Sequence, residues 1–281
     1  MKTILITGAS SGLGASLALL LASRGHRVWA TMRKLEKQQQ LADAAAQRKL
    51  DLVIAQLDVE KTESVAQCVA DMRSREGQID VLVNNAGAGF IRTTEQASED
   101  EIRWVMDINF MGVVRCTKAV LPHMREAKAG HIVNISSVGG LVGQPFNEIY
   151  CAAKFAVEGY TEAMASYIET GFGIKFSVVE PGGIKTEFVN NVMAQVQSTG
   201  GILQDSYLPL LQRYMGRIQA RAEGVFQTSD EVAEVVAGCI ESSDPPLRLR
   251  TSPWSEEFCK LKTSADPTGK LLQAAVVARY L

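Results

Sequence analysis

The sequence predicts an α/β fold built on a doubly wound parallel sheet. Short, almost wholly apolar segments alternate with longer helical segments from the first residues to about residue 180. Continuous apolar strands separated by helices are typical of a parallel sheet that is covered on both faces. Right-handed crossovers place those helices on both sides of the sheet. A glycine-rich turn between the first strand and the first helix favours the same fold.

The elements follow one another in a regular order. The expected strands cover residues 4–6, 26–31, 52–55, 80–83, 132–135 and 175–179. The expected helices cover residues 13–24, 36–49, 62–75, 98–123 and 148–170. Gly25 and Gly77 stand where the first and third helices end, as glycines commonly do. Ser98 and Glu101 have the spacing of a capping box, which predicts that the long fourth helix begins there.

Composition excludes several classes of protein. The chain has 281 residues, of which 46% are apolar and 21% are charged, and this is the balance of an ordinary globular protein. Its 29 basic and 31 acidic side chains give a net charge of −2, so there is no basic field for a nucleic acid. No apolar run approaches the ~18 residues that a membrane span needs.

Cysteine and histidine usage indicates the compartment. The five cysteines are scattered without a CxxC pair, as is typical of reduced thiols in an intracellular protein. The three histidines lack metal-ligand spacing, so we expect no metal site. Residues 15–23 resemble the apolar core of a secretion signal, but a strand and a glycine-rich turn precede them instead of a basic segment. We therefore expect a cytoplasmic protein.

The glycine-rich turn, TGASSGLG at residues 7–14, is the first chemical signal. Glycines at such a turn let the backbone approach a pyrophosphate, whose charge meets the free N–H groups at the helix N-terminus. The GxxxGxG spacing and the lack of a following Lys-Ser/Thr pair exclude a P-loop. The alternative is a purely structural loop. The predicted dinucleotide contacts here are Gly8, Ser10, Ser11, Gly12, Leu13 and Gly14.

The end of the second strand should select the dinucleotide. An acidic residue there binds the ribose 2′-hydroxyl of NAD, whereas an arginine accommodates the 2′-phosphate of NADP. The sequence has no carboxylate at residues 30–34 but has Arg33 and Lys34, and Ser10 and Ser11 add hydroxyl donors. This favours NADP(H), with NAD(H) as the alternative. The other interpretation of Arg33 and Lys34 is a solvated helix start.

Two further segments follow strands at the same edge of the sheet. Asp58 and Val59 follow the third strand, where a carboxylate can accept a hydrogen bond from the adenine amino group. Asn85, Ala86 and Gly87 follow the fourth strand, where small residues let the backbone lie close to a cofactor. Each could be an ordinary turn, but the carboxyl ends of parallel strands are where such sheets bind ligands.

Tyr150 and Lys154 have a spacing that places both on one face of a helix, and Ser137 follows the fifth strand. A phenol has a pKa near 10, and an ammonium group one turn away would lower it toward the working range. A serine hydroxyl can hydrogen-bond the oxygen of a substrate. The alternative is that Tyr150 packs in the core and Lys154 is solvated.

In this order, the motifs resemble those of the short-chain dehydrogenase/reductase family over residues 1–190. They are the TGASSGLG turn, NNAG at residues 84–87, and Ser137 placed thirteen residues before Tyr150. The resemblance implies a Rossmann-like sheet of about seven strands in the order 3-2-1-4-5-6-7, with residues 246–250 as the last strand. It also implies a single domain over residues 1–281.

The resemblance further implies a catalytic tetrad of Asn109, Ser137, Tyr150 and Lys154. Tyr150 would transfer the proton, Ser137 would hold the substrate oxygen, Lys154 would lower the pKa of Tyr150 and bind the nicotinamide ribose, and Asn109 would anchor a water in a proton relay. Tyr150 and Lys154 thus also count as cofactor contacts. A PGxxxT stretch would close over the nicotinamide through Pro181, Gly182, Ile184 and Thr186.

Residues 187–224 leave the βα rhythm and form a variable region within the domain. Tyr207, Leu211, Tyr214 and Ile218 recur at helical spacing. We interpret the region as the wall or lid of an apolar substrate cleft, and the alternative is an amphipathic helix that packs on the core or on another subunit. The substrate expected is a small apolar ketone or secondary alcohol.

The leading hypothesis is thus an NADP(H)-dependent carbonyl reductase or alcohol dehydrogenase. The alternatives are an epimerase or dehydratase on the same fold, and a regulator or scaffold that binds NADP(H) without turnover. The resemblance implies a homodimer or homotetramer joined through the helices at residues 98–123 and 148–170.

Overall fold

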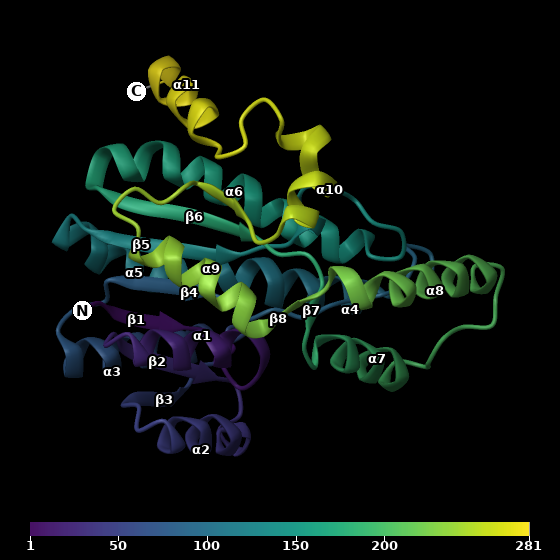
Figure 1. Cartoon of the computed structure of the whole chain (residues 1–281), viewed down its shortest axis with the longest axis horizontal. Helices are drawn as coiled ribbons and strands as arrows, with labels where there is room; N and C mark the ends of the chain where they lie inside the picture. Colours follow the sequence, from purple (N-terminus) through teal and green to yellow (C-terminus); the bar gives the residue numbers. More distant parts are fainter. Residues whose placement is uncertain (281) are drawn as a thin grey trace.

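A parallel sheet of seven strands, in the order β3-β2-β1-β4-β5-β6-β9, forms the centre of the molecule (Figure 1). This computed structural model describes the backbone of residues 1–280 and the side chains of all of these except 221–223, 279 and 280. The strands of the sheet are β1 (Thr3–Ile6), β2 (Arg27–Met32), β3 (Leu52–Gln56), β4 (Val81–Asn84), β5 (Gly130–Ile135), β6 (Ile174–Glu180) and β9 (Arg248–Arg250).

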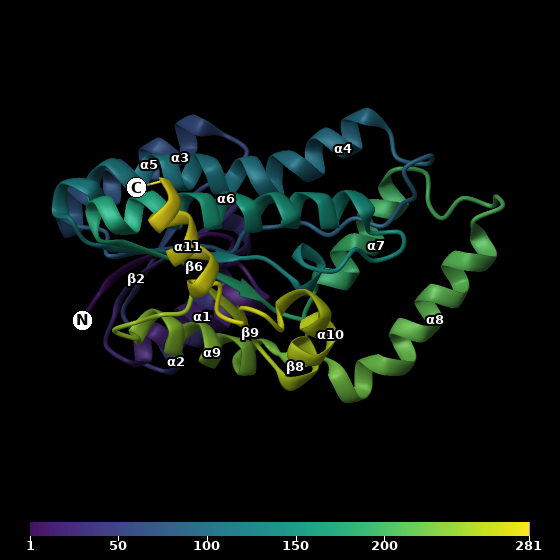
Figure 2. The same cartoon turned by 90° about the horizontal axis from the view of Figure 1, so that it is seen from above.

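Helices cover both faces of the sheet, as Figure 2 shows. One face carries α1 (Gly12–Ser23), α2 (Gln39–Gln47) and α9 (Ser229–Glu241). The other carries α3 (Thr62–Glu76), α5 (Gly112–Ala127) and α6 (Glu148–Phe172). Ile4 and Ile6 of β1 face the first layer and Leu5 faces the second, because successive side chains of a strand point to opposite faces. All three are fully buried, which confirms the predicted doubly wound sheet.

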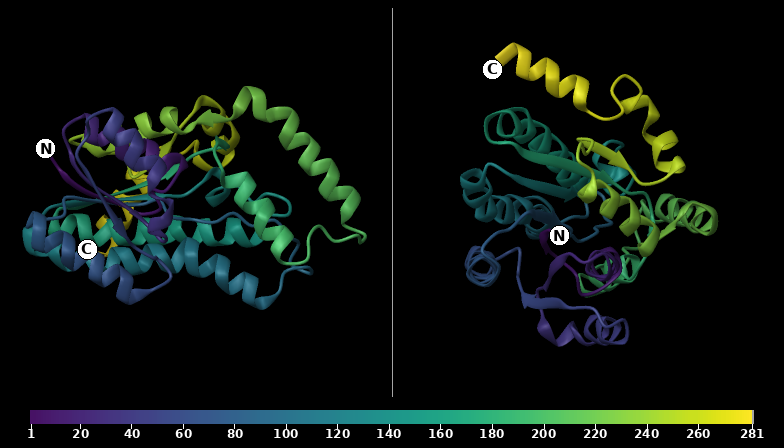
Figure 3. Two further views of the ribbon diagram at one scale, coloured as in Figure 1. Left: turned by 90° about the horizontal axis from the view of Figure 1, so that it is seen from below. Right: turned by 60° about the vertical axis from the view of Figure 1, so that its left-hand side comes forward.

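The last strand of the sheet has the predicted place but is the ninth strand of the chain. Two short strands, β7 (Ile184–Lys185) and β8 (Gln227–Thr228), pair with each other in a separate two-stranded sheet. Beyond β9, the chain forms α10 (Pro253–Thr263) and α11 (Lys270–Tyr280). Gln273 of α11 donates to the carbonyl oxygen of Ala165 in α6, so α11 lies against α6 (Figure 3, right).

The helix predicted from Ser98 toward His123 is interrupted. It consists of α4 (Glu99–Met106), a π-helical turn (Asp107–Met111) and α5. The capping box of Ser98 and Glu101 is present as predicted. The α-helix predicted at residues 36–49 is shorter than expected. A 3₁₀ turn (Leu35–Lys37) occupies its start, and α2 begins only at Gln39.

Residues 187–224 lie beyond the carboxyl ends of the strands. They form α7 (Phe188–Ser198) and most of α8 (Leu208–Val225), which project to the right in Figure 1 and in the left view of Figure 3. This places the variable region on the same side of the molecule as the loops that carry the predicted site. Within residues 1–280, no helix combines the length and apolar character that crossing a membrane requires.

Candidate active site

The glycine-rich turn packs closely against the segment that follows β4. Gly8 and Gly12 have φ values of +69° and +56°, which favour glycine. A Cβ on Gly8 would lie 2.7 Å from the Cα of Ala86, and one on Gly14 would lie 2.5 Å from the Gly8 carbonyl oxygen. These three positions therefore require glycine for the turn to keep its shape.

Asn85 and Thr7 hold this turn in place. The Asn85 Nδ2 donates to the carbonyl oxygens of Thr7 and Gly8, both at 3.0 Å. The Thr7 Oγ1 accepts from the backbone N–H groups of Asn85 and Ala86, both at 3.0 Å. The Asn85 side chain thus acts on the turn itself and fixes the backbone that would face a ligand.

The N-terminus of α1 fits a pyrophosphate. Ser11 directly precedes the helix in an extended conformation, and its side chain makes no capping hydrogen bond to the described residues. The first turn contains no acidic residue, so the partial positive charge of the helix end is not neutralised there. Ser11 is exposed and Ser10 is partly exposed. Free N–H groups and two hydroxyls at a helix N-terminus are a suitable cradle for an anion.

The residues after β2 and β3 lie side by side, since these strands are neighbours in the sheet. Arg33 follows β2 and pairs with Glu60 across an Nη1–Oε2 distance of 2.9 Å. Asp58 is partly exposed and its Oδ1 accepts from the backbone N–H of Glu60 at 3.1 Å, whereas Val59 is buried. Sequence reasoning missed Glu60. Its position directly after Asp58 and Val59 was the available signal.

Tyr150 and Lys154 lie one turn apart near the start of α6. Lys154 is 5% exposed, and its Nζ donates to the carbonyl oxygen of Ile135 at 2.9 Å. That Nζ lies 5.8 Å from the centre of the Tyr150 ring. The Ser137 Oγ accepts from the backbone N–H of Gly139 at 3.0 Å, which leaves the serine hydrogen free to be donated. The Ser137 side chain also acts to lower the pKa of Tyr150.

Burial sets the pKa values of both groups. It raises the pKa of Tyr150 to about 12, against the lowering effect of Ser137. It lowers the pKa of Lys154 to about 8, against the raising effect of Glu158. The expectation that Tyr150 has a lowered pKa is therefore wrong for the protein without ligands, because loss of water disfavours the phenolate more than its neighbours favour it. Tyr150 is a neutral phenol at neutral pH and can donate its proton.

Asn109, in the π-helical turn, lies close to Lys154 and Gly87. It is fully buried, and its Nδ2 donates to the carbonyl oxygens of Ala88 at 2.8 Å and Val105 at 3.0 Å. Its Oδ1 accepts from the Ala88 N–H at 3.1 Å. A Cβ on Gly87 would lie 2.9 Å from that Oδ1 and 3.6 Å from the Lys154 Nζ. Asn109 and Lys154 therefore border the same small space beside Gly87.

Residues 181–186, which follow β6, also lie at the edge of the sheet where the strands end. The Pro181 carbonyl oxygen accepts from the Val138 N–H at 3.0 Å, which joins this segment to the loop that carries Ser137. A Cβ on Gly12 would lie 3.1 Å from the Thr186 Cγ2, so the other end of the segment meets the glycine-rich turn. Gly182 packs against Trp254 of α10. The segment, with Ile184 in β7, thus spans the distance between the predicted pyrophosphate cradle and Ser137.

Comparison with known proteins agrees with this geometry. A family profile described as short chain dehydrogenase matches residues 2–197, about two thirds of the chain. The chain belongs to the short-chain dehydrogenase family. It is 41% identical to retinol dehydrogenase 8 of Bos taurus, over 96% of this chain and 87% of that protein. It is 37% identical to 17-beta-hydroxysteroid dehydrogenase type 1 of Homo sapiens, over 95% of this chain and 82% of that protein.

A solved structure of actinorhodin polyketide ketoreductase with NADPH superposes with a TM-score of 0.75 at 29% identity, covering 89% of this chain and 95% of that one. Membership of the short-chain dehydrogenase family makes this chain a hydride-transfer oxidoreductase that acts on a small molecule. The fold of the family binds a nicotinamide dinucleotide.

Helices α7 and α8 form a cover beside Tyr150 of the predicted tetrad of this short-chain dehydrogenase. The rings of Tyr150 and Phe188 meet edge to face at 6.2 Å, and a Cβ on Gly89 would collide with Phe188 and Val192. A hollow has mainly apolar walls, formed by Ile91, Phe146, Met193, Val196, Ile202, Leu203, Leu211 and Met215, and its lining is completed by Arg92, Gln96 and Gly201. None of the four residues of the predicted tetrad lines it.

Polar contacts tie this cover to the body of the dehydrogenase. Arg92, 6% exposed, pairs with Glu101 at 3.1 Å and donates to the carbonyl oxygen of Thr199 at 2.7 Å. Asn147 donates to the Tyr214 hydroxyl of α8 at 3.0 Å. The charge of Arg92 is thus satisfied within the wall of the hollow.

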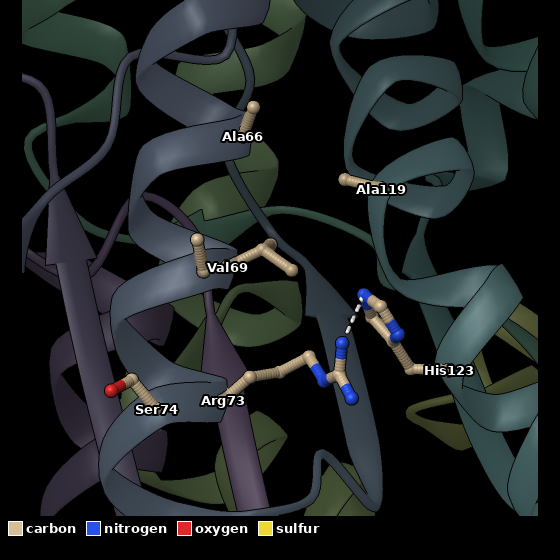
Figure 4. Close-up of a pocket in the computed structure, with 7 residues that line it drawn as sticks. Ala66, Val69, Arg73, Ser74, Ala119 and His123 are labelled. Atoms are coloured by element: carbon tan, nitrogen blue, oxygen red, sulfur yellow. Dashed lines mark hydrogen bonds between the residues drawn. The ribbon is translucent and has the colours of Figure 1, made fainter.

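A second hollow lies between α3 and α5, away from the predicted tetrad (Figure 4). Arg73 reaches across it to the His123 Nε2 at 3.3 Å, below small side chains that include Ala66 and Ala119. Burial and the neighbouring guanidinium both lower the pKa of His123. None of the residues predicted for the active site of the dehydrogenase lines this hollow.

Proposed function

We propose that the protein is an NADP(H)-dependent carbonyl reductase that interconverts apolar ketones and secondary alcohols. The observation that carries the proposal is the convergence of Lys154, Asn109 and Gly87 beside Tyr150, at the edge of the sheet where the glycine-rich turn lies. A group for proton transfer and a cradle for a dinucleotide thus occupy one site.

The cofactor would be held along this edge. Its contacts would be Gly8, Ser10, Ser11, Gly12, Leu13, Gly14, Arg33, Asp58, Val59, Asn85, Ala86, Gly87, Tyr150, Lys154, Pro181, Gly182, Ile184 and Thr186. When bound, the nicotinamide supplies or accepts a hydride, which is the part of the reaction that the protein's own side chains do not provide. The exposed Arg33 supports NADP(H), since its guanidinium can accommodate the 2′-phosphate.

The chain's own residues would handle the proton. In reduction, the Tyr150 phenol donates its proton to the carbonyl oxygen as the new alcohol forms, and in oxidation the proton returns. The free hydrogen of Ser137 is donated to that same oxygen and stabilises the negative charge that develops on it. The Lys154 ammonium favours the phenolate that remains after transfer. Asn109, anchored on Ala88, would hold a water that links Lys154 to solvent.

The substrate class follows from the cover over the site. The hollow lined by Ile91, Val196 and Leu211 is mainly apolar, which supports a hydrophobic substrate held by residues 187–224. The names of the relatives, a retinol dehydrogenase and a 17-beta-hydroxysteroid dehydrogenase, support a lipophilic alcohol or ketone. All five cysteines are free, which supports the cytoplasm as the compartment.

Tyr150→Phe tests the proposal. Turnover of NADPH with a panel of lipophilic ketones should fall by about 10²–10⁴-fold, because only the proton donor is removed. Binding of NADPH, followed by fluorescence, should remain within about twofold because the ring keeps its packing. A variant with a near-normal rate contradicts the role of Tyr150. Tight NADPH binding without turnover of any carbonyl by the wild type would instead indicate a binding protein.

A further inference from the structure

Glu60 and Arg33 form an ion pair at the end of the sheet where the adenosine ribose would bind. Met32 at the end of β2 is in register with Gln56 at the end of β3, so the residues that follow the two strands lie side by side. The Arg33 Nη1 lies 2.9 Å from the Glu60 Oε2. The end of β2 contains no carboxylate of its own, and the turn that follows β3 supplies one, that of Glu60.

The carboxylate is the better-anchored partner of this pair. The Glu60 side chain is 22% exposed, whereas that of Arg33 is 57% exposed. The Glu60 backbone N–H donates to Asp58 Oδ1 at 3.1 Å, and the Asp58 N–H donates to Ser64 Oγ at 2.9 Å. The turn that carries Glu60 is therefore held by side chains on both sides, and Arg33 extends from solvent toward it.

We propose that Glu60 is a cofactor-selectivity residue, whose carboxylate competes with the 2′-phosphate of NADP(H) for the Arg33 guanidinium. This inference rests on the function proposed above. A phosphate that binds Arg33 must share the guanidinium with the Glu60 carboxylate or displace that carboxylate from it. The phosphate would also be repelled by the negative charge of Glu60. The 2′-hydroxyl of NAD(H) has no charge and can donate to a carboxylate. Glu60 thus reduces the preference for NADP(H) over NAD(H) that Arg33 creates.

Binding titrations of Glu60→Gln test this inference without turnover. The dissociation constants of NADPH and NADH are measured by fluorescence for the wild type and the variant. We expect NADPH to bind about three- to tenfold more tightly to Glu60→Gln, the effect of removing one competing surface charge. NADH should change by less than about twofold. Glu63→Gln, an exposed carboxylate three residues further along, is the matched control and should leave the ratio of the two constants unchanged.

A double-mutant cycle with Arg33→Gln separates competition from simple repulsion. If Glu60 acts through Arg33, Glu60→Gln should improve NADPH binding much less when Arg33 is already replaced. A ratio of NADH to NADPH constants that rises less than about twofold in Glu60→Gln overturns the inference, as does full additivity in the cycle. If the wild type binds neither dinucleotide, the proposed function fails and the inference fails with it. If both bind and the ratio is unchanged, only the inference fails.

Discussion

At Tyr150 and Lys154, burial acts on two groups whose ionisation has opposite sign. Loss of water raises the pKa of the phenol to about 12 and lowers that of the ammonium to about 8. Both groups are thereby driven toward their neutral forms. Between these two pKa values the phenol is still protonated, while the lysine has lost its charge. The pH range of activity should therefore be limited by Lys154.

The rate of ketone reduction should report this loss of charge. The folded pKa of Lys154 lies below its ordinary value, so its stabilising charge is present below pH 8 and is lost as the pH rises through about 8. We expect kcat/KM with NADPH to be level below pH 8 and to fall about tenfold per pH unit above it. Circular dichroism over the same range is the control for unfolding. A level profile up to pH 10 in a folded protein contradicts this role of Lys154.

Glu158, one turn beyond Lys154, gives a second prediction at this scale. Burial raises the pKa of both Glu158 and Glu180, and Glu180 keeps a charged partner in Arg250 at 3.0 Å. Glu158 is therefore the protonated member of the pair. A raised folded pKa means that stability is lost as the pH rises above the unfolded value of Glu158, because the unfolded chain ionises there and the folded one does not.

The side chain of Glu158→Gln cannot ionise, so the variant should not lose stability in this way as the pH rises. Between pH 5 and 7, the free energy of unfolding in urea should increase for the variant relative to the wild type by at most about 1.4 kcal/mol per pH unit. A glutamine variant that becomes less stable than the wild type as the pH rises would show that Glu158 is ionised in the folded protein.

Single residues were predictable where a motif names them. The four-residue spacing of Tyr150 and Lys154 and the position of Ser137 predict that these residues form one site, and their catalytic roles stay a prediction. Glu60 was not predictable in the same way, since its partner Arg33 is 27 residues away and the two meet only because β2 and β3 are neighbours. The pKa of Tyr150 depends on how deeply the fold buries it, which spacing does not reveal.

Among the elements, the interrupted helix shows the limit of periodicity. The capping box at Ser98 predicted where the helix begins, but nothing in the spacing of residues 107–111 indicates a π-helical turn. Asn109 in this turn donates both to Val105 within the helix and to Ala88 in another loop, and such tertiary contacts cannot be read from spacing. Such turns are frequent at functional sites, and this one aims Asn109 at the space beside Gly87.

The helix α8 provides a prediction about substrate size. Leu211 is half-buried and lines the apolar hollow, whereas Gln212 beside it is exposed. Leu211→Asp should raise KM for large lipophilic ketones by about tenfold or more, the effect of losing apolar contact over one leucine. A small ketone that does not reach α8 should keep its kcat/KM within about twofold. Gln212→Asp is the matched control. Equal losses on large and small ketones would place Leu211 outside the substrate wall.

For the whole molecule, alternation of strands and helices was enough to predict the doubly wound sheet. The family resemblance then placed the last strand correctly next to β6. The small β7–β8 sheet was not predictable, because two-residue strands are too short to show a period. Tyr207, Leu211 and Tyr214 have helical spacing, and the last two lie in α8, which begins just after Tyr207. The position of α8 depends on contacts such as that of Asn147 with Tyr214, which spacing does not reveal.

The outer face of α6 bears on how copies of the chain associate. This helix has 25 residues, and its exposed positions include Ala152, Gly159 and Ala163, which follow one another at helical spacing. A glycine within an exposed helix costs about 1 kcal/mol relative to alanine. A Cβ on Gly159 would have open space within a single chain, so the chain itself gives no steric reason for a glycine there. Close approach of a second α6 would supply one.

We therefore expect a homo-oligomer joined through this face. Ala163→Arg should shift the sedimentation coefficient toward that of the monomer, because a long charged side chain prevents the close approach of two helices. Ala70→Arg, an exposed alanine on α3, adds the same charge away from this face and should leave the association unchanged. If only the contact between copies is affected, both variants should unfold at the same denaturant concentration as the wild type. An Ala163→Arg protein that sediments like the wild-type oligomer would exclude this face of α6 from the contact.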